Sequence, residues 1–408
     1  MDPAAARRFH LDRLWLAAQS SPTQGNRVEL LRNGEAFFPR LLAAIADARH
    51  WVHLETYIFD DDNIGTRVAE ALADAAGRGV RVELIVDGFG TGDHARRLRE
   101  RLAPLGVAVR IYRRPRWWRL DRRAMRRLHR KIAVIDDEIA FVGGINIIDD
   151  HHHPGAERGV LGPRFDYAVA VVGPLVAAVA LAARRLWWLL SVARPGPEAA
   201  SLPPWPRHSM RPLPGGVTAS LLLRDNLRHR RTIEHEYLTA LAGARNEVLI
   251  ACAYFVPGRR FRAELIAAAQ RGARVRLLLQ GRADHPIMFH AQQALHGQLL
   301  AGGVEIYLYQ PSYLHAKVAA IDDAWATVGS SNIDPYSLML AREANVVVYD
   351  RSFAVQLAAD IGAAIEHDSR QVMAAEHARR PWWIRGLNWA AYTFLRVATR
   401  LVTRGDVG

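Results

Sequence analysis

The sequence predicts an α/β fold built from two copies of one unit, and three observations predict it. Strand-like and helix-like stretches alternate in both halves of the 408-residue chain, which is typical of sheets covered by helices. A pattern that begins with His-x-Lys occurs twice, at His129 and at His315. Between the two copies, residues 194–216 are dense in proline and glycine, as expected of an exposed connection.

The first copy contains a β-α-β unit. Residues 51–59 alternate and are rich in aromatic and β-branched side chains, which predicts a strand. Residues 66–78 then carry apolar side chains at helical spacing, and a second strand is expected over 80–86.

The same order of elements returns in the second copy. We expect a strand over 247–256, a helix over 261–271 and a strand over 273–279. The residues that connect helix and strand also match, 77–82 against 270–275, so the chain contains an internal duplication. We predict five segments: an N-terminal extension (1–27), a first repeat (28–193), a linker (194–216), a second repeat (217–375) and a C-terminal segment rich in Trp and Arg (376–408).

Charge and cysteine content narrow the partners. Lys and Arg number 54 against 41 Asp and Glu, a net charge of +13, which favours nucleic acid, phosphorylated metabolites or an acidic membrane face as partners. The single cysteine, Cys252, excludes an internal disulfide and a cysteine-based zinc cage.

The repeated pattern is the strongest chemical signal. In each copy the Lys follows the His by two residues, an Asp (Asp136 or Asp322) by seven and an Asn (Asn146 or Asn332) by 17. Alternate residues of a strand share a face, so each His projects beside its Lys. Two histidines, two lysines and two asparagines could thus converge on one anion.

That set of side chains suits phosphoryl transfer. One His can attack phosphorus while the other protonates the leaving alcohol, and Lys and Asn stabilise the charged oxygens. This chemistry requires no metal and no cofactor, and we expect none. Because a single His on a strand is usually structural, the inference rests on the second matching copy.

The two copies resemble the phospholipase D superfamily, whose pattern is HxKxxxxD followed by GSxN or GGxN. The resemblance extends over 28–350 and implies two phospholipase D-like repeats, each a mixed sheet flanked by helices, with the active site at their interface. It implies a phosphohistidine intermediate, with His129 as nucleophile and His315 as general acid; the near symmetry of the repeats leaves this order open. The catalytic motifs comprise His129, Lys131, Asp136, His315, Lys317 and Asp322, and the phosphate-binding residues are Lys131, Lys317, Asn146 and Asn332.

Two further roles follow from the motif's surroundings. Asp136 and Asp322 come directly after a buried run, so we expect them to anchor local structure rather than to touch substrate. The family's acid that orients each imidazole falls at Asp166 and Glu343, each of which opens an apolar strand. An insertion separates Asp166 from His129 by more residues than separate Glu343 from His315.

Several stretches in both halves are similar to bacterial cardiolipin synthases of the B type, including 26–34, 53–59, 143–150, 253–258 and 329–335. The resemblance implies transfer of a phosphatidyl group from phosphatidylglycerol to an alcohol such as a second phosphatidylglycerol. The alternatives are a phospholipase D-type hydrolase or a nuclease acting on another phosphodiester, and a non-catalytic scaffold. Loss of one histidine would have indicated the scaffold.

We expect a peripheral protein at the cytoplasmic face of the bacterial membrane, because the apolar stretch 175–193 is interrupted by Arg184 and Arg185. Two segments could contact an anionic bilayer: the Arg/Trp run 113–127 and an amphipathic helix over 382–402. That helix could instead dock on the protein's own core. We expect phospholipid substrates, no nucleic acid and no obligate protein partner. The run His151 to His153 could ligate a metal, but we interpret it as an exposed insertion near the site.

Overall fold

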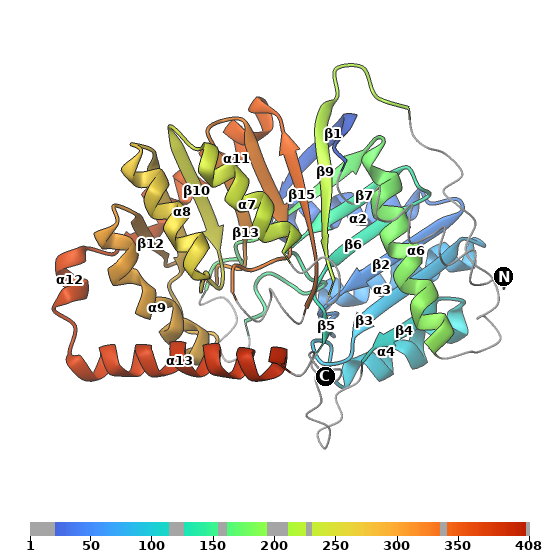
Figure 1. Ribbon diagram of the computed structural model, residues 1–408. Coiled ribbons are helices and arrows are strands. Elements are labelled where there is room, and N and C mark those ends of the chain that lie inside the picture. Colours follow the sequence, from blue (N-terminus) through green and yellow to red (C-terminus); the bar gives the residue numbers. More distant parts are fainter. Residues whose placement is uncertain are drawn as a thin grey trace.

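The computed structural model describes residues 21–113, 126–153, 161–193, 211–225, 231–334 and 341–404. Within these residues the strands form one continuous mixed sheet whose faces carry helices (Figure 1). The predicted α/β class is confirmed, and the five segment boundaries stay predictions.

The first repeat runs from β1 to α6. Its elements are β1 (Thr23–Arg32), α2 (Asn33–Ala46), β2 (Trp51–Thr56), α3 (Asn63–Gly77), β3 (Arg81–Asp87), α4 (His94–Leu102), η1 (Ala103–Leu105), β4 (Ala108–Tyr112), β5 (Arg127–Leu128), β6 (Lys131–Ile135), β7 (Ile139–Gly143), β8 (Tyr167–Val172) and α6 (Leu175–Ala193).

The second repeat repeats this order. Its elements are β9 (Val217–Arg224), α7 (Thr232–Gly243), β10 (Glu247–Cys252), α8 (Arg259–Gln270), β11 (Arg274–Gln280), α9 (Pro286–Ala301), β12 (Glu305–Tyr309), β13 (Lys317–Ile321), β14 (Trp325–Gly329), β15 (Ala341–Tyr349) and α11 (Arg351–Asp368). The chain continues through β16 (Ser369–Gln371), α12 (Ala374–Ala378) and α13 (Trp382–Arg404).

The order of strands across the sheet displays the duplication. It reads β16-β12-β11-β10-β13-β14-β15-β9-β1-β8-β7-β6-β2-β3-β4, so β1 and β9 meet at the centre and the strands mirror one another outward, except that β16 beyond β12 has no counterpart. The strands β2, β3 and β4 pair in parallel, as do β10, β11 and β12, whereas the strands nearer the centre and the edge strand β16 pair antiparallel. The ends of β6 and β13 that carry the His-x-Lys patterns therefore approach each other from opposite repeats.

Three large apolar clusters and a smaller fourth one, around Leu128 and Trp187, hold the layers together in the described part of the chain. One joins α2, α3 and α4 to the first half of the sheet, and a second joins α7, α8 and α9 to the other half. The third contains buried residues of both α6 and α11 with strands of both repeats. Because this last cluster is shared, the two repeats form a single core and the site between them is held rigidly.

The apolar helix α6 covers the stretch that Arg184 and Arg185 interrupt. Among the described residues it is the one helix long and apolar enough to do so, over Leu175–Val192. About 56% of that stretch is buried inside the molecule, and Arg184 within it bonds Asp137 at 2.7 Å. It is therefore packed here as a core helix.

Candidate active site

Both motif histidines lie at the boundary between the repeats, because each is held by backbone of the opposite repeat. The short strand β5, directly before His129, pairs in parallel with β15 of the second repeat. The His129 N–H donates to the carbonyl of Arg342 at 3.0 Å. In the same way the His315 N–H donates to the carbonyl of Phe165 at 2.8 Å, and Leu314 bridges Phe165.

This exchange of backbone pairs each histidine with the carboxylate of the other repeat. Nδ1 of His129 lies 3.0 Å from a carboxylate oxygen of Glu343, and Nδ1 of His315 lies 2.6 Å from Asp166. Both carboxylates are buried, whereas the side chains of His129 and His315 are 16% and 19% exposed. With Nδ1 occupied, Nε2 of each ring is the nitrogen left to meet a substrate.

The two carboxylates are supported differently. Oε2 of Glu343 accepts the Ser330 hydroxyl at 2.5 Å. Gly144 occupies the matching place in the first repeat, and a Cβ there would lie 2.3 Å from Oδ1 of Asp166. The position of Asp166 thus requires a glycine at position 144 of the Gly-Gly-x-Asn pattern. In the Gly-Ser-x-Asn pattern of the second repeat, Ser330 serves as a hydrogen-bond donor.

The lysines and asparagines of both patterns surround the histidines. Nζ of Lys131 donates to the carbonyl of His129 at 2.6 Å, and Lys317 bonds the carbonyl of His315 in the same way. The side-chain carbonyls of Asn146 and Asn332 accept backbone N–H groups from the strands' continuations beyond β2 and β10. Each asparagine therefore keeps its NH₂ group as the end able to donate to an anion.

Asp136 and Asp322 lie at the far ends of β6 and β13, about 16 Å from the lysines by strand rise. The Asp136 carboxylate accepts three backbone N–H groups, from Arg49 to Trp51, at 2.7 to 2.8 Å. Asp322 does the same for residues 245–247. Each aspartate thus holds the loop before the neighbouring strand, β2 or β10, at the end of its own strand remote from the lysine.

The charges of the two halves differ. Burial lowers the pKa of His129, and Glu343 only partly offsets this effect. For Glu343, burial would raise the pKa, but the charge of His129, together with Lys131 and Ser330, lowers it. In the other pair, burial raises the pKa of Asp166 to about 7 and lowers that of His315 well below its usual value. The His315–Asp166 pair therefore retains a proton up to about pH 7, whereas the lowered pKa values of His129 and Glu343 favour loss of the proton from the other pair.

Lys131 and Lys317 are also perturbed. Burial lowers the pKa of Lys131 to about 7, with Lys317 adding to the effect, and burial lowers the pKa of Lys317 as well. Two adjacent buried ammonium groups are costly, and a bound anion relieves that cost. The site is therefore suited to bind a phosphodiester.

Sequence reasoning missed the residues that hold the histidine loops. The carboxylate of Asp87, at the end of β3, accepts the N–H of Leu128 at 2.8 Å, and Gln280, at the end of β11, accepts the N–H of Leu314 at 3.2 Å. Tyr57 lies edge-on to the His129 ring, with centroids 4.9 Å apart. A polar residue that ends an otherwise apolar strand was the signal available for Asp87 and Gln280.

A second omission is a buried charge network behind the first motif. Its members are His53, Glu55, Glu83 and Arg130, each no more than 4% exposed. The two ring nitrogens of His53 lie 2.9 Å from Glu55 and 3.0 Å from Glu83, and Arg130 makes two bonds to Glu55.

The protonation of this network follows from its contacts. Burial opposes charge on His53, but the hydrogen bonds to Glu55 and Glu83 outweigh burial and raise its pKa. Burial likewise opposes charge on Glu55, yet Arg130 and His53 lower its pKa to about 2. Arg130 also donates to the carbonyl of Ala182 in α6 at 3.0 Å. The residue between His129 and Lys131 is thus fixed from behind by charged groups.

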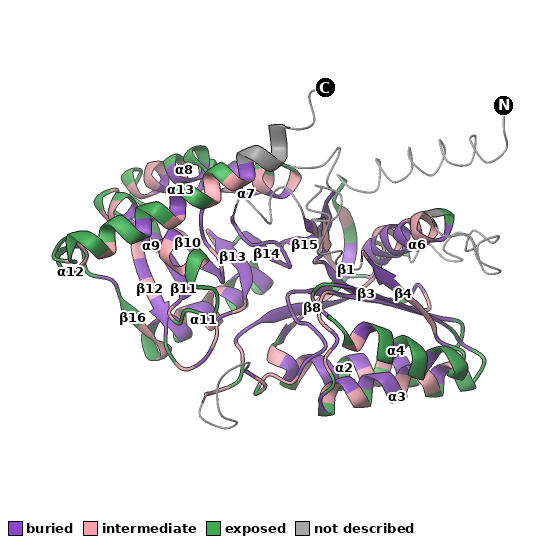
Figure 2. Ribbon diagram, turned by 90° about the horizontal axis from the view of Figure 1, so that it is seen from below, coloured by how far each residue is buried: buried purple, intermediate pink, exposed green. Residues whose placement is uncertain are grey.

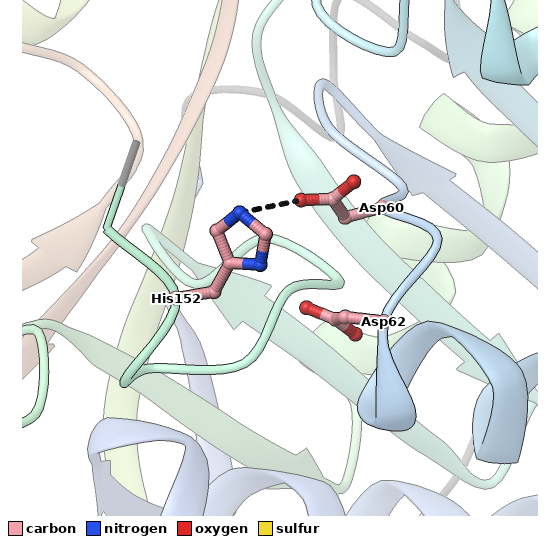
Figure 3. Close-up of side chains that lie close together, drawn as sticks. All are labelled: Asp60, Asp62 and His152. Atoms are coloured by element: carbon pink, nitrogen blue, oxygen red, sulfur yellow. Dashed lines mark ion pairs between the residues drawn. The ribbon is translucent and has the colours of Figure 1, made fainter. Parts of the chain in front are cut away.

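The histidine run His151 to His153 lies beside the loop between β2 and α3. Figure 3 shows His152 facing two aspartates of that loop. Ligand atoms of Asp60, Asp62 and His152 lie within 4.8 Å of one another. Sequence spacing did not indicate these acidic neighbours. Asp62 already accepts N–H groups of Gly65, where it caps α3, and of Asp149, and His152 is 40% exposed, so hydrogen bonding accounts for the arrangement. Most of the basic run, residues 114–125, falls outside the described residues.

Comparison with known proteins agrees with this geometry. The sequence family described as "Cardiolipin synthase, PLD-like domain" matches residues 41–160 and 237–365. The chain is 40% identical to cardiolipin synthase B of Escherichia coli K12 over 386 residues, covering 93% of this chain and 90% of that protein. Cardiolipin synthase A of Pseudomonas putida F1 is 31% identical over 86% of this chain and 71% of that protein.

Solved structures share the fold at low sequence identity. The phosphatidylserine synthase of Haemophilus influenzae superposes with a TM-score of 0.68 at 15% identity, over 96% of this chain and 99% of that one. A polyphosphate kinase of Porphyromonas gingivalis gives 0.56 at 14% identity, over 92% of this chain and 53% of that one.

Fold and site together define an enzyme of the phospholipase D superfamily, in which two repeats contribute one His-x-Lys each. Within that superfamily, the chain belongs to the family of cardiolipin synthases with phospholipase D-like domains.

Proposed function

We propose that this enzyme transfers a phosphatidyl group from phosphatidylglycerol to the hydroxyl of an acceptor, such as a second phosphatidylglycerol, and releases glycerol. The observation that carries the proposal is the pair of histidines, each bonded through Nδ1 to a buried carboxylate of the opposite repeat. The similarity to cardiolipin synthase B over nearly the whole chain supports the choice of substrates.

In the first step, Nε2 of His129 attacks phosphorus and the bond from phosphorus to the glycerol oxygen breaks. His315 gives its proton to that oxygen, so glycerol leaves as a neutral alcohol and a phosphatidyl-histidine remains. Lys131, Lys317 and the two asparagines stabilise the charged phosphate oxygens.

In the second step, the acceptor hydroxyl gives its proton to His315 and attacks the same phosphorus. The phosphorus–nitrogen bond breaks, His129 is released and a new phosphodiester forms. Water in place of the acceptor would yield phosphatidic acid, so exclusion of water decides between transfer and hydrolysis.

The charges of the two halves support this order of roles. A nucleophilic imidazole must be unprotonated, as the lowered pKa of His129 favours. A general acid must carry a proton, and the His315–Asp166 pair retains one up to about neutral pH because burial raises the pKa of Asp166 to about 7. We propose that Glu343 and Asp166 fix the ring orientation of His129 and His315, respectively.

We further propose that the enzyme works as a peripheral protein at the anionic, cytoplasmic face of the membrane, without a cofactor. The net charge of +13 favours such a surface.

The test is incubation of the purified protein with phosphatidylglycerol vesicles, followed by mass spectrometry of lipids and released glycerol. Cardiolipin with an equal amount of glycerol is expected. Phosphatidic acid alone would mean a hydrolase. The absence of any lipid product, together with cleavage of a nucleic acid, would mean a nuclease.

A further inference from the structure

The C-terminal helix α13 turns its apolar side chains away from the protein. Six large apolar residues on it are between 47% and 83% exposed, half of all exposed large apolar side chains among the described residues. They are Trp382, Trp383, Leu387, Trp389, Phe394 and Val397. Helical spacing places them on one face, and Figure 2 shows exposed positions along the length of the helix.

The opposite face of α13, which contacts the protein, carries fewer large apolar side chains and mixes them with polar ones; Ala391, Tyr392 and Leu395 pack against the core of the second repeat. Asn388, Tyr392 and Thr399 are between 2% and 9% exposed. The amide oxygen of Asn388 bonds Nδ1 of His290 on α9 at 2.8 Å, and the Tyr392 hydroxyl accepts from Arg262 on α8 at 3.4 Å. A helix of a water-soluble surface has the reverse arrangement, with its apolar stripe toward the core. Docking on the protein's own core therefore leaves the apolar face of α13 uncovered.

We propose that the outward face of α13 is the enzyme's membrane-docking surface, with the helix lying in the plane of an anionic bilayer. This inference rests on the proposed function, which places the substrate in a membrane. Tryptophan and phenylalanine favour the interfacial zone, and the exposed Arg385 on the same helix suits anionic headgroups. The net charge of +13 adds attraction of the same sign.

The dimensions and support of α13 suit this role. The 23 residues extend about 34 Å along the lower edge of the second repeat in Figure 1. Because Asn388 and Tyr392 already fasten the helix to α9 and α8, the surface exists before binding, and docking requires no folding of a disordered segment.

The test is co-sedimentation of the full-length protein with vesicles of phosphatidylglycerol and phosphatidylethanolamine. The variant Leu387→Ser/Trp389→Ser/Phe394→Ser should bind at least tenfold more weakly than the parent. Val355→Ser removes an apolar side chain that is 42% exposed on α11 and should bind like the parent. Thermal melting checks that each variant is folded.

A second measurement keeps the surface testable if the triple variant fails to fold. Brominated lipids should quench the parent's tryptophan fluorescence, and Trp382→Phe/Trp383→Phe/Trp389→Phe should remain bound but lose most of that quenching. Unchanged binding of a folded triple variant, or unchanged quenching in the phenylalanine variant, would overturn the proposal. The proposal would also be overturned if the parent failed to bind vesicles but formed a dimer in sedimentation velocity, and if the triple variant were a monomer. In that case α13 would pair with a second copy of the chain. Binding without turnover would contradict the proposed function and leave the surface standing.

Discussion

The first and second repeats place the same strands around the site but surround their histidines with different chemistry. Behind His129 lies Arg130 with its network of buried charges, whereas the matching residue behind His315 is Ala316. The strand positions that match His53 and Glu55 are Leu249 and Ala251. A buried ion network seldom adds stability over apolar packing, so its presence in one repeat only suggests a task that belongs to that repeat.

The two carboxylates that pair with the histidines, Glu343 and Asp166, also differ in their surroundings. Glu343 is longer than Asp166 and accepts the Ser330 hydroxyl, whereas Asp166 lies against Gly144. The pKa of Glu343 is lowered, while burial raises that of Asp166 to about 7. A duplicated fold can therefore keep one backbone and give its two histidines environments suited to different tasks, one to a nucleophile and the other to a general acid.

The largest effect is expected from the histidines themselves. His129→Ala and His315→Ala should each lower turnover of phosphatidylglycerol by about 10⁴-fold or more, because each removes a group that bonds to or protonates the substrate. An ester with a nitrophenol leaving group needs no protonation, so it should restore formation of the phosphohistidine in His315→Ala but not in His129→Ala. Rescue of His129→Ala alone would reverse the assigned roles.

The pairing across the repeats predicts which half each acid serves. Asp166→Asn should lower turnover by about 10²- to 10⁴-fold, since the amide cannot hold the imidazolium of His315. Although Asp166 belongs to the first repeat, nitrophenyl esters should rescue this variant as they rescue His315→Ala. Glu343→Gln should resist rescue. The reverse pattern would mean that each acid acts within its own repeat.

The pH profile sharpens the same comparison. A group with a pKa of about 7 binds its proton below that pH and loses it above. Formation of the phosphohistidine from phosphatidylglycerol should therefore slow as the pH rises through about 7, because the His315–Asp166 pair loses the proton it donates. The pH–rate profile of Asp166→Asn should not show this decline. The profile of the parent enzyme with a nitrophenyl ester should not show it either. A decline that persists with the ester would assign the titration to another group, such as Lys131, whose pKa burial lowers to about 7.

Exchanging the residues at the matching positions Gly144 and Ser330 should lower turnover by different amounts in the two repeats. Gly144→Ser forces a Cβ to within 2.3 Å of Asp166, so turnover should fall by about tenfold to 10²-fold as that carboxylate is displaced. Ser330→Gly removes one hydrogen bond to Glu343, worth about 1.5–3 kcal/mol for a charged acceptor, and leaves its pairing with His129 in place. Steady-state rates of the two variants and of the parent test the difference. Equal losses would show that Gly144 is not set by Asp166.

The sequence predicted the duplication, the strands and helices of both units, and the motifs, because these depend on periodicity and on repeated spacing. It could not predict that Glu343 meets His129 and that Asp166 meets His315, since counting residues along the chain says nothing of how two repeats dock. The network around His53 could not be predicted either, because its members come from β2, from β3 and from the residue before β6. The amphipathic pattern of α13 was legible, but which face meets the protein depends on polar partners such as His290 on another helix.

The smallest expected effect concerns the network behind His129. Replacing three of its members as in the second repeat, through His53→Leu/Glu55→Ala/Arg130→Ala, should leave the fold intact, since apolar side chains already fill these places in the other half and Glu83 keeps Arg81 and Trp51 as partners. Turnover should nevertheless fall by about tenfold, because Arg130 no longer fixes the strand between His129 and Lys131. Arg130→Ala alone should instead destabilise the protein by about 3–5 kcal/mol, as it leaves Glu55 without its main partner.

A control is the Asp137–Arg184 pair, which is also buried and also ties α6 to the sheet, but which bonds neither motif histidine nor Arg130 and meets the network only through the ring of Trp51. Asp137→Asn/Arg184→Met should alter the melting temperature without lowering the rate of phosphohistidine formation. If the triple variant and this control lose activity equally, the network stabilises α6 and does not position His129. If only the triple variant loses activity, and does so in the histidine phosphorylation step, the charges in the first repeat serve the nucleophile, which the second repeat does not need.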